Sequence, residues 1–183
     1  MDIAQRIDRL EAEAQIRQLV ARYCFTIDDR DLGGVDALFA TDATVRSADG
    51  VMFAQGKAAI IDQYRGRFSV LGPGQHFMHD IALEFFDDRP DEVHGRVSGH
   101  AELWRNGMMM VAALRYDDVY RREGGQWLFA DRLISFLYYV PIDQYPGILG
   151  TTRRNRAYAE PKEADFPEKL ASWQAYEEKR DDR

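Results

Sequence analysis

Four long segments in the second half of the chain alternate between apolar and polar residues and are separated by short links. They cover residues 75–87, 92–105, 108–122 and 126–140. The links are Asp87–Asp91, Arg105-Asn106-Gly107 and Glu123–Gln126, all rich in turn-forming residues. A period of two is typical of β-strands, and strands joined by such short links run antiparallel. The pattern therefore predicts one antiparallel meander.

The N-terminal part of the chain has helical periodicity instead. Apolar residues recur at steps of three and four through Ile3, Ile7, Leu10, Ala14, Ile16, Leu19, Val20, Tyr23 and Ile27. They predict a long amphipathic helix that ends near Asp28–Asp31, and Asp31 is the predicted N-cap of a short second helix. The remaining predicted elements are strands at 43–47 and 51–54 and a third helix at 56–68, followed by a break at Leu71-Gly72-Pro73-Gly74.

The apolar residues of the predicted meander need a cover. Without one, the sheet would expose Val97, Leu103, Val111, Leu114 and Leu133. The fold class is therefore α+β, with N-terminal helices packed on a strongly curved, mainly antiparallel sheet that forms a cone-shaped barrel with one open mouth. We expect this domain to span residues 1–142. Residues 143–183 are predicted to form a C-terminal arm with a terminal helix near 166–180, packed on the domain or on a partner subunit.

Composition narrows the class of protein. The chain has 24 basic and 31 acidic residues, a formal charge of −7, which argues against a nucleic-acid-binding surface. The single cysteine, Cys24, rules out an intrachain disulfide, and its apolar helical surroundings favour a buried thiol. Because the N-terminus lacks a signal pattern and no apolar run approaches the ~20 residues of a membrane span, we expect a soluble, cytoplasmic protein.

Two residues stand out as candidate catalytic groups. Asp28 ends the predicted first helix, and His76 begins the predicted meander within Gly74-Gln75-His76-Phe77. If the helix packs on the sheet, Asp28 can orient the imidazole of His76 and leave its other ring nitrogen free to move a proton near neutral pH. Both residues also have an ordinary structural interpretation, because aspartates end helices and histidines form hydrogen bonds at strand ends.

The chain resembles the SnoaL-like branch of the nuclear-transport-factor-2-like superfamily over about residues 8–141. The resemblance is carried by residues 16–23, Asp28 and Asp31, residues 38–43, residues 56–60, Gln75-His76-Phe77 and residues 120–127. This branch includes scytalone dehydratase and hexachlorocyclohexane dehydrochlorinase. The resemblance implies a cone-shaped fold in which an aspartate at the end of the first helix supports a histidine on the third strand, at Asp28 and His76 here.

Further residues are candidates for contacts with a substrate. A phenol donor is predicted from Tyr23 and from either Tyr138 or Tyr139 in the last strand. His100 belongs to a polar strand face that would line either a wet pocket or the outer surface. Arg115 interrupts an apolar strand, so its guanidinium needs either a carboxylate partner or an anionic ligand. The same reasoning applies to Arg132.

These features favour a cofactor-independent lyase that acts on a small aromatic or cyclic hydroxylated compound, by dehydratase-type elimination or by loss of a small carbon fragment. Nucleotide-binding loops and nucleophile motifs are absent from the sequence, and the four histidines lack metal-ligand spacing, so we expect neither a cofactor nor a metal. The alternatives are an isomerase or polyketide cyclase and a non-catalytic small subunit of a ring-hydroxylating dioxygenase. A homodimer or homotrimer is expected.

Overall fold

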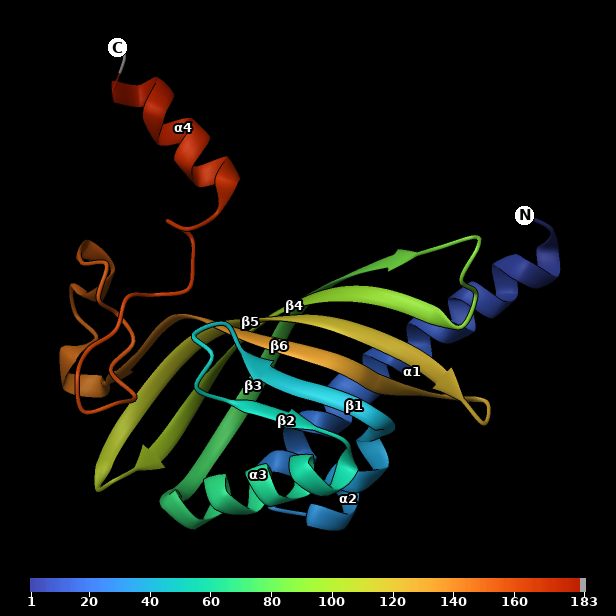
Figure 1. Cartoon of the computed structure of the whole chain (residues 1–183), viewed down its shortest axis with the longest axis horizontal. Coiled ribbons are helices and arrows are strands. Elements are labelled where there is room, and N and C mark those ends of the chain that lie inside the picture. The colour runs from blue at the N-terminus through green and yellow to red at the C-terminus, as the bar shows by residue number, and fades with distance from the viewer. Residues whose placement is uncertain (182–183) are drawn as a thin grey trace.

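A six-stranded sheet in the order β2-β1-β6-β5-β4-β3 forms the body of the protein (Figure 1). The computed structural model describes residues 1–181. The helices are α1 Ile3–Asp28, α2 Leu32–Leu38, α3 Lys57–Val70 and α4 Ala171–Asp181. The strands are β1 Phe39–Ser47, β2 Phe53–Gln55, β3 Leu71–Phe85, β4 Glu92–Arg105, β5 Met108–Glu123 and β6 Gln126–Pro141. None of the described helices is long and apolar enough to cross a membrane.

The predicted meander is confirmed. Strands β3 to β6 pair in sequence order, and each neighbouring pair is antiparallel. The strand β1 adds to the free side of β6 in the parallel direction and carries β2 at the edge of the sheet. The sheet is therefore mainly antiparallel, with its first strand beside its last, and it curves into the predicted cone.

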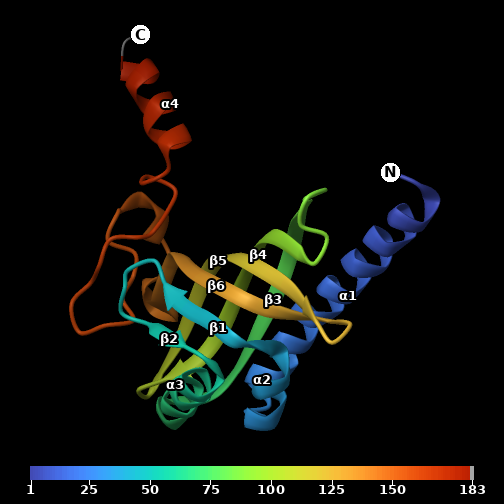
Figure 2. The same ribbon diagram turned by 45° about the vertical axis from the view of Figure 1, so that its right-hand side comes forward.

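The helices α1, α2 and α3 cover the concave face of the sheet (Figure 2). Ile16, Leu19 and Tyr23 of α1 are almost fully buried, and so are Ile60 and Tyr64 of α3. Of the apolar sheet residues that were expected to need a cover, Val97, Leu103 and Leu114 lie in this core. Val111 and Leu133 occupy the alternate positions on the outer face and are only half-buried, because side chains alternate along a strand.

The chain reverses direction between α1 and α2 in a way that places Asp28. The helix α1 begins with a capping box formed by Asp2 and Gln5 and ends at Asp28. Arg30 then adopts a left-handed conformation with φ of 57°, and the Asp31 carboxylate accepts a hydrogen bond from the Gly34 N–H, which confirms the predicted N-cap. This turn leaves Asp28 at the end of α1, facing β3.

The strand β3 begins earlier than the sequence predicts. It starts at Leu71, directly after α3, and runs through Gly72-Pro73-Gly74, where a break was expected. A Cβ atom on Gly72 would lie 2.6 Å from Trp104, and one on Gly74 would lie 2.6 Å from Leu103. These glycines allow β3 to pass close under the side chains of β4, so they serve close packing and not a turn.

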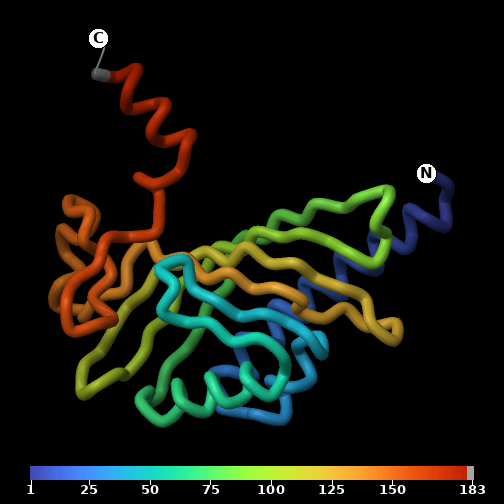
Figure 3. Tube along the Cα trace, in the orientation of Figure 1, coloured from blue at the N-terminus to red at the C-terminus, as the bar shows by residue number. Residues whose placement is uncertain are grey.

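The C-terminal arm adds a layer at the end of β6. Tyr139 donates its backbone N–H to the Arg154 carbonyl and accepts from the Arg156 N–H. The Arg154 side chain is buried and forms two hydrogen bonds of 2.7 Å with Glu168. The terminal helix begins at Ala171, not near Phe166 as predicted, because the chain passes through Pro167 first. It extends away from the body (Figures 1 and 3).

Candidate active site

Asp28 and His76 form a closely bonded pair. The His76 Nδ1 lies 2.6 Å from Asp28 Oδ1, and the His76 backbone N–H donates to Asp28 Oδ2 at 2.9 Å. The two side chains are 15% and 6% exposed. With Nδ1 donating to the carboxylate, the lone pair resides on Nε2, and no group among residues 1–181 is hydrogen-bonded to that nitrogen. The pair therefore presents an oriented base.

The fold supplies this geometry from two distant parts of the chain. Asp28 is the last residue of α1, and the helix packs along β3 so that the carboxylate reaches the strand. His76 lies on the inner face of β3 and is 8% exposed. Because the carboxylate binds both the ring and the backbone of the same residue, the imidazole has little freedom to rotate. Such two-point support is the arrangement that a general base requires.

A row of paired residues with small side chains at its centre extends from His76 across the sheet. In the strand register His76 is opposite Ala101, Ala101 is opposite Ala112, and Ala112 is opposite Tyr139. Three strand spacings separate the two ends of this row, which corresponds to about 14 Å. The two middle positions carry only methyl groups and are 0% and 1% exposed, so this row, called the alanine floor below, lies within the core between the imidazole and the phenol.

Two tyrosines from the helices lie in the same core as this row. The hydroxyls of Tyr23 in α1 and Tyr64 in α3 are 2.9 Å apart, and each residue is 1% exposed. Burial raises the pKa of Tyr64 well above its ordinary value, and the neighbouring Tyr23 adds to the shift. The Tyr64 phenol therefore stays protonated, so this hydroxyl pair can offer a hydrogen bond to an oxygen atom of a ligand.

A buried ion pair lies beneath the tyrosines. The Arg132 guanidinium donates from Nε and Nη2 to the two oxygens of Asp118, both at 2.8 Å, and both side chains are 0% exposed. The rings of Tyr23, Tyr116 and Phe129 surround the guanidinium at 4.0–4.1 Å. Arg132 therefore has the carboxylate partner that the sequence requires, while its Nη1 is enclosed without a hydrogen bond to any residue of the described chain.

The structure brings two of the five predicted substrate contacts to the same side of the sheet as the pair. Tyr23 and Tyr139 are both in the buried core. Between Ala113 and Leu114 the register with β6 shifts by one residue, and this bulge turns Tyr139 inward and Tyr138 outward. Tyr138 packs against Tyr145, and burial together with that neighbour raises the pKa of Tyr138 to about 12.

His100, Arg115 and Tyr138 lie on the outer face, away from Asp28 and His76. The His100 ring stacks on Phe77 with a centroid distance of 4.6 Å, and its Nδ1 is 2.6 Å from His79 Nε2. The Arg115 guanidinium stacks on Phe166 at 4.2 Å. The alternation of side chains along β4, β5 and β6 separates these three residues from the floor, so the structure does not join them to the pair.

A small cavity near the open ends of β4 and β6 contains residues that the sequence did not single out. It has a volume of about 170 Å³, and its lining includes Met52, Arg67, Arg105, Phe136, Tyr139 and Tyr158. Arg67 is three residues after Tyr64 in α3, so both occupy one helix face. That spacing was a usable signal for Arg67, whereas nothing in the sequence distinguished Arg105 from the turn residues that follow it.

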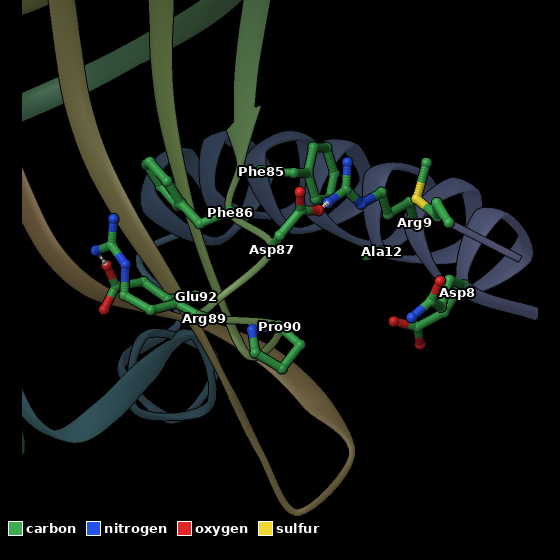
Figure 4. A pocket seen from close by; sticks show the side chains of 11 residues that line it. Asp8, Arg9, Ala12, Phe85, Phe86, Asp87, Arg89, Pro90 and Glu92 are labelled. Atoms are coloured by element: carbon green, nitrogen blue, oxygen red, sulfur yellow. Dashed lines mark hydrogen bonds and ion pairs between the residues drawn. The ribbon is translucent and has the colours of Figure 1, made fainter.

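A separate pocket of about 240 Å³ lies between the first turns of α1 and the β3–β4 hairpin (Figure 4). Its charges are paired, Asp8 with Arg122 outside the pocket and the others with one another. Arg9 binds Asp87 at 2.5 Å and lies over the Phe85 ring, while Arg89 pairs with Glu92. It contains neither Asp28 nor His76, so we assign no function to it.

Cys24 is buried in α1, as predicted, and is poorly suited to act as a nucleophile. Burial raises the pKa of its thiol to about 11. Compared with a thiol of the ordinary pKa of 9.0, the thiolate fraction at neutral pH is roughly 100-fold smaller. Nor do three or more His, Cys, Asp or Glu side chains within residues 1–181 gather as a metal site would require.

We expect Cys24 in the native protein to react with iodoacetamide at least about 100-fold more slowly than a free thiol at pH 7.5, because both the thiolate population and access are reduced. Mass spectrometry of timed samples measures the rate. The same reaction in 6 M guanidinium chloride is the control and should label the thiol fully. Labelling at equal rates in the two conditions would contradict the buried assignment.

Several known structures share this fold. The crystal structure of LinA superposes with a TM-score of 0.70 at 22% identity, covering 76% of this chain and 95% of LinA. A putative scytalone dehydratase from Novosphingobium aromaticivorans superposes with a TM-score of 0.68 at 20% identity, covering 74% and 91% of the two chains. A Mycobacterium tuberculosis protein of unknown function gives 0.62 at 24% identity, covering 72% and 76%.

At these identities the structural likeness establishes the fold, a cone-shaped α+β fold of the nuclear-transport-factor-2-like type. Among curated proteins, none matches this chain significantly in sequence. The SnoaL-like domain family matches residues 8–132, which include most of α1, both members of the Asp28–His76 pair and Arg132. Because that match covers well over half of the sequence, the chain belongs to the SnoaL-like domain family.

Proposed function

We propose that this protein is a cofactor-independent lyase that acts on a small aromatic or cyclic hydroxylated compound. The observation that carries the proposal is the Asp28–His76 pair, in which the carboxylate holds Nδ1 and leaves Nε2 without a protein partner. A base in that state can accept a proton from a substrate above the Ala101 and Ala112 floor. The names of two similar structures, a dehydrochlorinase and a putative dehydratase, describe eliminations and support the same class of reaction.

The residues have distinct roles in the proposed reaction. The His76 Nε2 takes a proton from a carbon next to the departing group, and the C–H electron pair forms the new double bond. The C–O bond to the hydroxyl breaks, and the hydroxide leaves as water with the proton that His76 returns. Asp28 stabilises the imidazolium in between, a general acid/base contribution of about 10²–10⁴ in rate. A hydroxyl of the Tyr23–Tyr64 pair stabilises negative charge on a substrate oxygen.

The same groups suit a second leaving group. If His76 removes the proton of a primary hydroxyl on a diol side chain, the carbon–carbon bond breaks to release formaldehyde. The electron pair of the broken carbon–carbon bond forms a double bond to the carbon that carries the second hydroxyl. That hydroxyl leaves as water with the proton from the imidazolium. Both reactions use one base and one acid on the same face of the substrate, which a single imidazole can provide.

A panel of aryl diols, β-hydroxy ketones and enolisable cyclic ketones, incubated in D₂O without added cofactor, tests the function. Mass spectrometry should reveal a product that is lighter by water, or by water and formaldehyde together. Loss of that product in Asp28→Asn and His76→Gln supports the assignment. A product that has lost no atoms and whose mass has risen only by carbon-bound deuterium would indicate the isomerase. Co-purification with a larger iron-bearing chain, without turnover of the panel, would indicate the dioxygenase subunit.

A further inference from the structure

We propose that Arg67 and Arg105 form a carboxylate-binding subsite, so that the substrate is an aromatic carboxylic acid. This inference rests on the proposed function, because it describes how a substrate of the Asp28–His76 pair would be anchored. The subsite is the cavity of about 170 Å³ between α3 and the open ends of β4 and β6. Both arginines line it, and no acidic side chain does.

Each of the two guanidinium groups has an enclosed nitrogen without a hydrogen-bond partner in the described part of the chain. Arg67 Nη1 and Arg105 Nε are both enclosed, and neither has a hydrogen-bond acceptor among residues 1–181. Arg67 lies over the Tyr64 ring at 5.5 Å, and Arg105 lies over the Tyr139 ring at 5.6 Å. Ring faces attract a cation but do not accept its directed N–H bonds as a carboxylate does.

Arg67 and Arg105 are half-buried, whereas Arg132 and Arg154 are fully buried and have carboxylate partners. Arg132 is bound by both oxygens of Asp118, and Arg154 is bound by both oxygens of Glu168. The chain has an excess of seven acidic residues, so carboxylates are plentiful. Two arginines that share one cavity without any carboxylate repel each other and leave N–H groups unsatisfied. A ligand with a planar carboxylate would satisfy both, because its oxygens match the guanidinium fork.

The rest of the cavity suits an aromatic ring. Phe136, Tyr139 and Tyr158 supply ring surfaces, and Met52 supplies a flexible apolar wall. A cavity of about 150 Å³ is known to hold benzene. The volume of about 170 Å³ therefore accommodates one aryl ring, with its carboxylate directed at the arginines.

Tyr139 belongs both to the lining of the subsite and to the row of residues that leads to the proposed base. This residue lines the cavity and also ends the row that begins at His76 and crosses Ala101 and Ala112. An elongated aryl carboxylate anchored at Arg67 and Arg105 would extend over the alanine floor toward Nε2. The arginines are thus positioned to select the substrate and to set the distance of its reacting carbon from the base.

Binding of 4-hydroxybenzoate and of its neutral counterpart 4-hydroxybenzamide tests the subsite without turnover. NMR titrations at fixed ionic strength give the two dissociation constants. We expect wild-type protein to bind the acid at least about tenfold more tightly than the amide, and Arg67→Met or Arg105→Met to remove that preference. Arg115→Met, on the outer face, is the matched control and should leave both affinities unchanged.

The stability of the variants separates a binding role from a structural one. Because the two guanidinium groups lack carboxylate partners, Arg67→Met and Arg105→Met should unfold at a temperature no lower than wild type. Equal affinity for acid and amide, or a preference that survives both substitutions, would overturn the subsite. Acid binding depends on neither His76 nor turnover, so a failure of the lyase assignment would appear separately, as selective binding without product.

Discussion

Replacing His76 by Gln lowers kcat/KM by about 10²–10⁴-fold on any substrate found for this protein, because the variant has no group that can take and return a proton at this position. Glutamine retains similar size and a donor that can still face Asp28, so the fold should be unchanged. The measurement is a steady-state comparison with wild type, accompanied by circular dichroism and thermal unfolding. The loss should appear mainly in kcat, since the proton moves in the transition state.

The outer face of the same strand offers a matched control. His79 is exposed and bonds to His100, so His79→Gln removes an imidazole from β3 without touching the floor. This control variant should keep wild-type activity. Asp28→Asn should lose activity as well, because an amide neither selects the Nδ1–H tautomer nor stabilises imidazolium. Turnover that persists in His76→Gln would remove this residue from the mechanism.

Replacing Asp118 by Ala should lower the free energy of unfolding by about 3–5 kcal/mol, the usual effect of removing one partner from a buried ion pair. The Arg132 guanidinium would be left as an uncompensated charge among three aromatic rings, and Tyr120 would lose the acceptor of its 2.9 Å hydrogen bond. Urea denaturation at pH 7 measures the change. The double variant Asp118→Leu with Arg132→Met removes both charges and should recover most of the loss.

An exposed ion pair of the same type provides the comparison. Arg96 and Asp117 are joined at 2.7 Å with side chains that are 63% and 39% exposed. Asp117→Ala should cost no more than about 1 kcal/mol, since water already solvates both charges. If Asp118→Ala proves insoluble, Asp118→Asn tests the same point while retaining an acceptor for Tyr120. A loss below about 1 kcal/mol in either Asp118 variant would contradict a structural role for the pair.

Local patterns were sufficient for the architecture. The four alternating segments and their short links predicted the meander, and the structure confirms it with boundaries displaced by a few residues. Asp31 was recognisable as an N-cap from its place after the first helix. Within the meander, the largest displacement of a boundary is at the start of β3. It arose because Gly72 and Gly74 serve close packing against β4, and the sequence alone does not distinguish such glycines from those of a turn.

The directions of individual side chains were less predictable. A single bulge between Ala113 and Leu114 decides that Tyr139, and not Tyr138, faces the floor. Alternation alone left His100 and Arg115 as candidates, because either face of an isolated strand can be the inner one. Arg105 and Tyr158 meet at one cavity only because the C-terminal arm packs against the end of β6.

The order of helices and strands and the need for a cover on the sheet follow from the sequence, because periodicity and turn chemistry carry them. The candidacy of Asp28 and His76 follows from the residue types at the ends of elements and from the resemblance to the SnoaL-like branch. The folded structure was needed to bring Asp28 within 2.6 Å of His76, to pair Arg132 with Asp118, and to place Arg67 and Arg105 in one cavity. Each of those contacts joins distant segments, and their geometry depends on sheet curvature, strand register and bulges, which arise when the whole core packs at once.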